Sequence, residues 1–391
     1  MSLSLDLLLD ELFSQRAQAQ QLRTRRIVRS LDAVHVEIDG VRFTNFCGND
    51  YLGLTHHPRI IAALAASAAI NGCGAGAAGL ISGYTPAHAA AEAAIAGWKG
   101  TGASILLPSG YQANHAAIQT VASVGGAKPG RVRFLIDKLA HASLLDAVRG
   151  ANAPWRVFPH NGIKKLARLL REAEAGQLQV VITESIFSMD GDAADLAALA
   201  ELKSKHPFVL LLDEAHAGGV YGPGGAGLAA ELKLSGAVDI SIATLSKAAG
   251  VAGGAICASQ KFRDAVVNLG RAYIYSTSVP PAIADAIRVA IEVMKDESQR
   301  AARVRALAKE VRDRLKTGGL DLPAGDSPII PIIIGDEAAA LRRARELADR
   351  KLLVQAVRPP SVPRNTSRLR VTLSCEHTDA EIGQLIETLL K

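Results

Sequence analysis

Short apolar runs alternate with helical patterns through the middle of the chain. The apolar runs lie within ASILLP, RVRFLID, QVVITES, FVLLLDE, DISIATLSK and GGAICAS, and helical patterns begin between them at Tyr111, His141 and Asp195. Strands that are apolar on both faces and joined by helices are typical of parallel sheets covered on both sides. The middle of the chain therefore predicts one doubly wound α/β domain with a mostly parallel sheet.

The two ends of the chain show other patterns. Apolar residues at helical spacing predict a helix over 5–13, and alternating residues around Asp39-Gly40 predict a β-hairpin at 34–46. After Pro280-Pro281, charged helical patterns precede strand patterns near 328–334, 353–357 and 368–373. We therefore expect three segments, namely an N-terminal helix and hairpin arm at 1–52, a large α/β domain at 53–283 and a smaller C-terminal α+β domain at 284–391.

Composition limits the function classes. The 391 residues are 49% hydrophobic, which is enough for a sizeable core. The net charge is +6, and only 4% of the residues are aromatic, too few for a stacking surface that binds single-stranded nucleic acid. This balance favours acidic small-molecule substrates over nucleic acid as partners.

Cysteine spacing and the N-terminal sequence predict a cytoplasmic protein. The cysteines form no C-x-x-C pair, which argues against a disulfide framework and against a thiolate metal site. Acidic residues interrupt the N-terminal apolar run, which is unlike a signal peptide. Residues 60–91 carry no charge, but their glycines predict two short helices around a loop rather than a membrane span.

One glycine motif matches the residue pattern of a dinucleotide-binding fingerprint but not its structural context. Gly74-x-Gly76-x-x-Gly79 follows a helical pattern, whereas the fingerprint requires a preceding strand. The next acidic residue, Glu92, is also too close to serve as the ribose ligand. We therefore interpret this motif as a flexible loop.

Polar side chains follow three of the apolar strands, at the edge where open parallel sheets bind ligands. QVVITES leads to Ser188, FVLLLDE leads to Asp213 and then His216, and DISIATLSK leads to Thr244 and Lys247. A lone buried carboxylate costs several kcal/mol, so Asp213 needs a positive partner. A buried ion pair with Lys247, without catalytic meaning, is one interpretation.

A phosphate-binding pattern favours a second interpretation. Ser109-Gly110-Tyr111 stands between a strand and a helix, where backbone N–H groups can bind phosphate. Together with a buried acid, a hydroxyl residue three before a lysine and a histidine after a strand, this pattern suits pyridoxal phosphate. Lys247 would form a Schiff base with its aldehyde, Asp213 would hold its pyridine nitrogen protonated, and Gly110, Tyr111 and Thr244 would hold its phosphate.

Two other function classes fit single features. Thr244-x-x-Lys247 has the spacing of an acyl hydrolase nucleophile, but that nucleophile opens a helix, whereas Thr244 follows an apolar strand. A nucleic-acid-binding protein would rest on the pI of about 9.2 alone and would need its basic residues along one face. A yellow colour that borohydride bleaches would distinguish pyridoxal phosphate from both.

Segments spread over nearly the whole chain resemble the α-oxoamine synthases, a family of fold-type-I pyridoxal phosphate enzymes. They are LRTRR, NDYLGL, SGY, DKLAHASLLDA, TESIFSMDGD, DEAHAGGVYG, ATLSKAAG, YSTSVPPA, RPPSVP and RLRVTLS. The resemblance implies a PLP-transferase architecture in which the large domain binds the cofactor. It also implies a homodimer with active sites at the subunit interface.

The resemblance assigns cofactor roles to individual residues. It makes Lys247 the Schiff-base lysine and Asp213 the pyridinium partner. It also places His141 over the ring face, for which a helix-capping or core histidine is the simpler alternative. Ser188 and His216 would hydrogen-bond the phenolic oxygen of the ring or its surroundings. Thr277 would reach the phosphate of the neighbouring subunit's cofactor.

The resemblance also assigns substrate roles. Asn49 and Arg370 would bind the amino-acid carboxylate, and Arg23, Arg358 and Ser361 would face the acyl substrate. Arg23 alternatively belongs to a solvated basic patch. The RPPSVP segment is most similar to the biotin-pathway member of the family, which implies decarboxylative condensation of L-alanine with a pimeloyl thioester. The alternative is a sibling enzyme that joins glycine or serine to a different acyl-CoA.

Overall fold

The computed structural model describes residues 4–19, 21–126, 130–323 and 325–391. The chain forms two compact units, a large unit of residues 49–306 and a small unit that combines 1–48 with 307–391. The sequence patterns predict three consecutive segments. The structure groups the arm with the C-terminal segment because β3 (Val41–Asn45) pairs in parallel with β12 (Leu352–Leu353).

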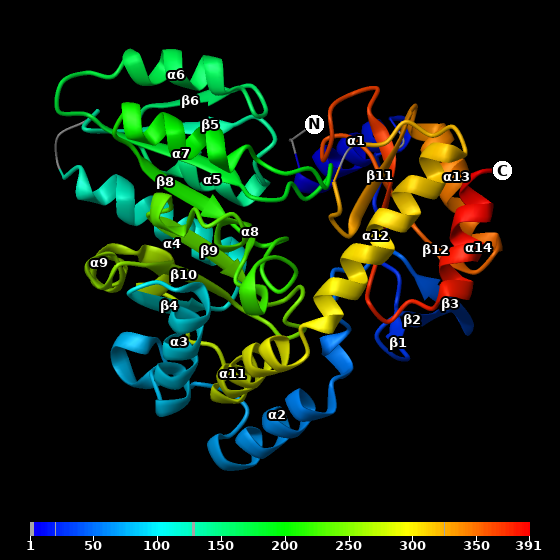
Figure 1. Ribbon diagram of the computed structural model, residues 1–391, viewed down its shortest axis with the longest axis horizontal. Coiled ribbons are helices and arrows are strands. Elements are labelled where there is room, and N and C mark those ends of the chain that lie inside the picture. Colours follow the sequence, from blue (N-terminus) through cyan, green and yellow to red (C-terminus); the bar gives the residue numbers. More distant parts are fainter. Residues whose placement is uncertain (1–3, 20, 127–129, 324) are drawn as a thin grey trace. The chain divides into compact units, whose positions relative to one another are not determined.

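A seven-stranded sheet forms the centre of the large unit (Figure 1). Its order is β4-β10-β9-β8-β7-β5-β6, and β10 is antiparallel to both of its neighbours, whereas β9, β8, β7, β5 and β6 are mutually parallel. The doubly wound, mostly parallel sheet predicted from the sequence is confirmed. The strands are β4 (Ala103–Leu107), β5 (Val132–Asp137), β6 (Trp155–Phe158), β7 (Leu178–Glu184), β8 (Val209–Asp213), β9 (Ile240–Thr244) and β10 (Gly254–Ala258).

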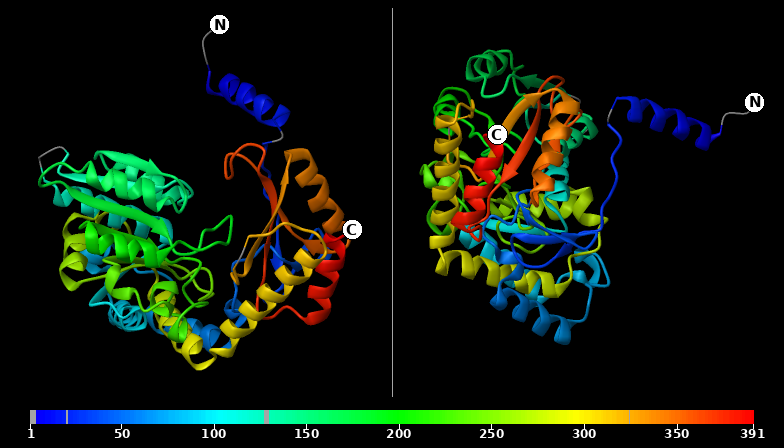
Figure 2. Two further views of the ribbon diagram at one scale, coloured as in Figure 1. Left: turned by 45° about the horizontal axis from the view of Figure 1, so that its top comes forward. Right: turned by 90° about the vertical axis from the view of Figure 1, so that its right-hand side faces the viewer.

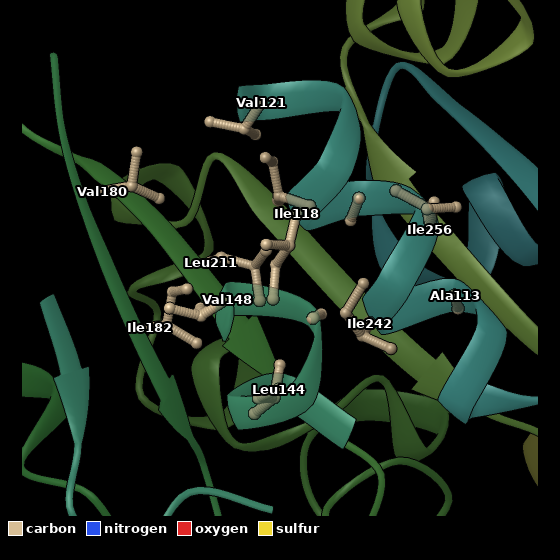
Figure 3. Packing of buried hydrophobic residues seen from close by; sticks show 14 of the residues in the cluster. Ala113, Ile118, Val121, Leu144, Val148, Val180, Ile182, Leu211, Ile242 and Ile256 are labelled. Carbon is tan, nitrogen blue, oxygen red and sulfur yellow. The ribbon is translucent and has the colours of Figure 1, made fainter. Parts of the chain in front are cut away.

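Apolar side chains pack two helices against one face of this sheet. Ile118 of α4 (Gly110–Val124) and Leu144 of α5 (Ala142–Gly150) pack over Ile182, Leu211 and Ile242, as Figure 3 shows. All five side chains are almost fully buried. Each fully buried aliphatic side chain contributes about 1.5–3 kcal/mol, so this layer fixes the positions of both helix N-termini relative to the strand ends.

The remaining helices of the large unit begin where the sequence contains helix-starting residues. Asp195 accepts a hydrogen bond from Ala198 N–H and caps α7, and proline opens α2, α3 and α11. The glycine motif at 74–79 joins α2 to α3 and follows no strand, as predicted. These helices are α2 (Pro58–Asn71), α3 (Pro86–Lys99), α6 (Ile163–Arg171), α7 (Leu196–Lys205), α8 (Leu228–Glu231), α9 (Gln260–Leu269), α10 (Arg271–Ile274) and α11 (Pro281–Asp296), and the short turns are η1 (Leu54–His56), η2 (Gly79–Gly83), η3 (Pro223–Gly225) and η4 (Ser235–Ala237).

The small unit contains two small sheets, ordered β1-β2-β3-β12 and β11-β14-β13. The predicted hairpin turns at Asp39 and Gly40, whose φ angles of 50° and 75° fit a type I′ turn. The N-terminal helix α1 (Leu5–Gln18) buries none of its residues and stands off both sheets (Figure 2). The other elements are β1 (Arg29–Ser30), β2 (His35–Ile38), β11 (Ile329–Gly335), β13 (Gln355–Val357), β14 (Ser367–Thr372), α13 (Glu337–Asp349), α14 (Asp379–Leu389) and α12 (Gln299–Thr317), within which the two units divide.

No helix in the described parts of the chain combines the length and apolar character that crossing a membrane requires.

Candidate active site

The predicted residues of the large unit gather at the carboxyl ends of its parallel strands. Asp213 is the last residue of β8, and Thr244 is the last residue of β9. His216 and Lys247 lie in the turns that follow these two strands. Ser188 is buried in the loop after β7. Because parallel strands end at one edge of a sheet, the fold brings these side chains to the same edge.

Uncharged hydrogen-bond donors hold the Asp213 carboxylate. The residue is 4% exposed, its Oδ1 accepts from Ala215 N–H at 2.9 Å, and its Oδ2 accepts from Nδ2 of Asn114 at 2.9 Å. Among the described residues these donors, rather than the Lys247 ammonium, are its partners. Each carboxylate oxygen has a second lone pair, so Asp213 can also accept from a ring N–H.

His141 caps α5 and is linked to Asp213 through hydrogen bonds. Its Nδ1 lies 2.7 Å from Oγ of Ser143, and that hydroxyl accepts from Nδ2 of Asn114 at 2.9 Å. Desolvation lowers the pKa of His141, and the positive charge of Lys247 adds to this effect while Asp213 opposes it. His141 thus caps α5, and its lowered pKa favours the neutral imidazole.

Lys247 and His216 are hydrogen-bonded to each other. Nζ of Lys247 lies 2.9 Å from Nε2 of His216. Nδ1 of the same imidazole lies 2.6 Å from the hydroxyl of Tyr51, which in turn donates to Oδ1 of Asn49 at 3.1 Å. The predicted residues Asn49, His216 and Lys247 therefore belong to one hydrogen-bonded row, which Tyr51 completes.

The start of α4 has the shape of a phosphate cradle. A side chain on Gly110 would put its Cβ 2.4 Å from Oγ1 of Thr244, and one on Gly254 would put it 2.4 Å from the backbone nitrogen of Gly110. Glycine is therefore required at both positions, and Gly110, at the helix start, lies beside the Thr244 hydroxyl. The Tyr111 hydroxyl instead donates to Oδ2 of Asp146 at 3.1 Å, and its ring stacks on His115.

Thr277 lies outside this cluster of strand ends. It is exposed and forms an isolated antiparallel bridge with Ala78, next to the glycine loop. Leu80 and Ile81 of that loop are 49% and 81% exposed.

The predicted acyl-binding residues belong to the small unit. Nη2 of Arg23 donates to Oγ of Ser361 at 3.2 Å. Arg23 and Arg358 line one cavity of about 890 Å³ together with Arg26, Arg342 and Arg345. Burial lowers the pKa of Arg358, and the positive charge of Arg23 lowers it further. Such a concentration of positive charge favours a bound anion.

Arg370 lies elsewhere in the small unit. It is 8% exposed on β14, where it pairs with Pro331 of β11 and Gln355 of β13.

Sequence reasoning missed three polar residues of the large unit. Tyr51 lies within the NDYLGL segment, Glu184 precedes Ser188 in TESIFSMDGD, and Asn114 lies one helical turn after Gly110. Glu184 is buried, and the backbone N–H of His141 hydrogen-bonds to its carboxyl group. Only the positions of Tyr51 and Glu184 within the quoted segments gave a signal for them.

A third histidine joins two loops at the edge of the sheet. Nδ1 of His160 lies 3.2 Å from Oδ1 of Asp137, at the end of β5, and its Nε2 lies 2.7 Å from Oδ2 of Asp192. Burial alone would lower the pKa of His160, but these two carboxylates raise it to about 10. The charged imidazole therefore ties the loop before His141 to the loop that carries Ser188.

These residues fit pyridoxal phosphate. The cradle at Gly110 and Thr244 suits the phosphate, the buried Asp213 carboxylate suits a protonated pyridine nitrogen, and the Lys247 amine suits an aldehyde. The chemistry of the donor set and the steric requirement for glycine thus agree on one cofactor.

Comparison with known proteins decides the family. The model of the aminotransferase class I and II family matches residues 41–389. The 8-amino-7-oxononanoate synthase of Anaeromyxobacter dehalogenans is 40% identical, over 95% of this chain and 94% of the relative. The enzyme of that name from Pseudomonas putida is also 40% identical, over 96% and 95%. The chain belongs to the α-oxoamine synthases.

Solved structures agree with this membership. A serine palmitoyltransferase of Sphingomonas wittichii matches with a TM-score of 0.92 at 26% identity, over 99% of this chain and 98% of that one. A structure of SPT with PLP matches with the same TM-score and identity. This α-oxoamine synthase therefore has the fold-type-I architecture and uses pyridoxal phosphate, and both predictions are confirmed.

Proposed function

We propose that this α-oxoamine synthase condenses L-alanine with a pimeloyl thioester to give 8-amino-7-oxononanoate, CO₂ and the free thiol carrier. The observation that carries this proposal is the arginine-lined cavity of the small unit. Relatives that are 40% identical and carry the name 8-amino-7-oxononanoate synthase support it.

The cavity combines the two properties that a pimeloyl chain requires. Leu22, Leu341 and Leu353 offer apolar surface for methylene groups. The arginines offer a positive partner for the carboxylate at the end of the chain, whose burial without one would cost several kcal/mol. An uncharged acyl chain has no use for these charges, which favours the biotin-pathway activity over a sibling activity.

Pyridoxal phosphate, when bound, supplies an aldehyde for the amino acid and a ring that withdraws electrons from its Cα. The amine of Lys247 moves the proton at Cα of alanine, and the Asp213 carboxylate keeps positive charge at the ring nitrogen. Cα then bonds to the thioester carbonyl carbon while the C–S bond breaks and the carrier leaves as a thiol. Loss of CO₂ follows, and a proton returns to Cα.

The other site residues would orient the reactants. Asn49 and Arg370 would bind the alanine carboxylate, the arginine through a bidentate pair. His141, Ser188 and His216 would contact the cofactor ring, and Gly110, Tyr111 and Thr244 its phosphate. An active site that a second subunit completes through Thr277 would agree with the exposed apolar residues Leu80 and Ile81 beside it.

A product assay tests the proposal. L-alanine, glycine and L-serine are each combined with pimeloyl-CoA, a pimeloyl carrier protein, heptanoyl-CoA and palmitoyl-CoA, and the products are identified by mass spectrometry. We expect the highest kcat/KM for L-alanine with a pimeloyl donor, and the two pimeloyl donors identify the carrier. Equal use of heptanoyl-CoA or palmitoyl-CoA would contradict the biotin-pathway assignment.

A further inference from the structure

Tyr51 connects two residues of the proposed site. Its side chain is fully buried, and its hydroxyl lies 3.1 Å from Oδ1 of Asn49 and 2.6 Å from Nδ1 of His216. Nε2 of His216 lies 2.9 Å from Nζ of Lys247. A continuous row of hydrogen bonds thus leads from Asn49 to Lys247 within the large unit.

The donors and acceptors of this row indicate which atom carries each proton. A tyrosine hydroxyl has one proton, and here the hydroxyl donates it to Oδ1 of Asn49. The oxygen of Tyr51 can then only accept from His216, so Nδ1 of His216 carries the ring proton. A neutral imidazole protonated at Nδ1 leaves the lone pair of Nε2 directed at Lys247.

We propose that Tyr51 is a positioning residue that fixes the Nδ1–H tautomer of His216 and thereby makes Nε2 the hydrogen-bond acceptor for the amine of Lys247. The oxygen of the buried Tyr51 hydroxyl accepts the Nδ1–H of His216 and so sets the tautomer. Phenylalanine has no such acceptor. Tyr51 is linked to Lys247 through the imidazole of His216.

The role of Asn49 connects this row to the substrate, and this step rests on the proposed function. A carboxylate only accepts hydrogen bonds, so Asn49 would turn Nδ2 toward the alanine carboxylate and keep Oδ1 toward Tyr51. Binding of the amino acid would therefore stabilise the same direction of hydrogen bonding along the row. The lysine amine would then donate an N–H to Nε2 of His216 and keep its lone pair for the Cα proton when substrate is present.

Tyr51→Phe tests the inference because it removes the hydroxyl and keeps the ring. The matched control is Tyr221→Phe, since Tyr221 is also buried and its ring lies 4.5 Å from the Arg305 guanidinium, a contact that phenylalanine preserves. Both variants and the wild type are produced at full length with ¹⁵N-labelled histidine. Ring ¹⁵N shifts of His216, measured with and without pyridoxal phosphate, report which nitrogen carries the proton.

We expect His216 to carry its proton on Nδ1 in the wild type and in Tyr221→Phe, and to populate the Nε2–H tautomer in Tyr51→Phe. We also expect kcat of the Tyr51→Phe holoenzyme to fall about tenfold or more, because Lys247 loses its oriented acceptor. A purely structural tyrosine would lower the thermal unfolding temperature without moving the tautomer.

Three results would overturn the inference: a proton on Nε2 in the wild type, an unchanged tautomer in Tyr51→Phe, or a changed tautomer with unchanged kcat. Failure of the proposed function is distinguishable from these results. The tautomer shift needs no substrate, and kcat can be measured with whichever acyl donor the product assay identifies.

Discussion

Glu184 and Asp213 stand side by side as the last registered pair of the neighbouring parallel strands β7 and β8. Both side chains are buried. Burial raises the pKa of Glu184 well above its ordinary value, and the negative charge of Asp213 raises it further, against the opposing effect of Lys247. The raised pKa favours the neutral form of Glu184. A neutral neighbour leaves the Asp213 carboxylate available to a pyridinium nitrogen.

Asp213→Asn should keep the fold and the cofactor but lose most turnover. The amide keeps the size and shape of the side chain but has one accepting oxygen instead of two and supplies no charge to hold the ring nitrogen protonated, so we expect kcat to fall at least about 100-fold. Steady-state kinetics and the bound-cofactor absorbance measure the two effects. Asp264→Asn on α9 is the control. Activity within about threefold of wild type, or about 0.7 kcal/mol, would mean that Asp213 does not support the electron sink.

Lys247→Ala should abolish covalent, borohydride-reducible attachment of pyridoxal phosphate while the protein stays folded. The variant removes the Lys247 amine, which we propose forms the bond to the cofactor aldehyde. Mass spectrometry of borohydride-treated protein measures the attachment, and Lys164→Ala on α6 should keep it. Cofactor fixed on a different lysine of the wild type would refute the assignment.

His160→Gln should destabilise the protein in a pH-dependent way. The pKa of His160 is raised to about 10 by Asp137 and Asp192, so its charged form stabilises the folded state. This contribution is complete below the unfolded pKa of about 6.5 and is lost as the pH rises through the folded value. We expect about 1–3 kcal/mol at low pH, from hydrogen bonds to charged groups.

Thermal unfolding of wild type, His160→Gln and the control His206→Gln at several pH values between about 6 and 10 measures this effect. The gap between wild type and His160→Gln should narrow as the pH rises. A gap that stays constant over this range would show that the charge of His160 is not the source of its stabilisation.

The sequence predicted the large sheet because its strands are apolar on both faces, a pattern that few other structures produce. It predicted Asp213, Thr244 and Lys247 at one edge because parallel strands share the direction in which they end. The pairing of β3 with β12 was not predictable, because two short strands far apart in sequence carry no mutual signal. Tyr51 was missed for a related reason. An aromatic residue beside apolar residues is usually part of a core, and only the tertiary contact with His216 shows that its hydroxyl is hydrogen-bonded to a residue of the candidate site.

Arg23→Ala should weaken the binding of the pimeloyl donor and leave alanine binding unchanged. Arg23 contacts Ser361 and shares its cavity with Arg358, and we propose that this cavity receives the terminal carboxylate. Loss of binding that is equal in the ground state and the transition state raises KM without lowering kcat. We therefore expect KM for the pimeloyl thioester to rise about tenfold, the equivalent of about 1.4 kcal/mol, while spectral titration with L-alanine gives the wild-type affinity.

A sharper measurement on Arg23→Ala compares acyl donors with and without a terminal carboxylate. Heptanoyl thioester has the same chain length as the pimeloyl donor but no terminal carboxylate, so it gains nothing from Arg23. Its kcat/KM should be nearly the same in wild type and in Arg23→Ala, and the preference for pimeloyl over heptanoyl should therefore shrink. Arg314→Ala, on the exposed face of α12 and paired with Glu310, serves as a charge-matched control outside the cavity. If Arg23→Ala lowers kcat/KM for both donors equally, then Arg23 acts on the part that the two acyl donors have in common, and the cavity does not bind the terminal carboxylate.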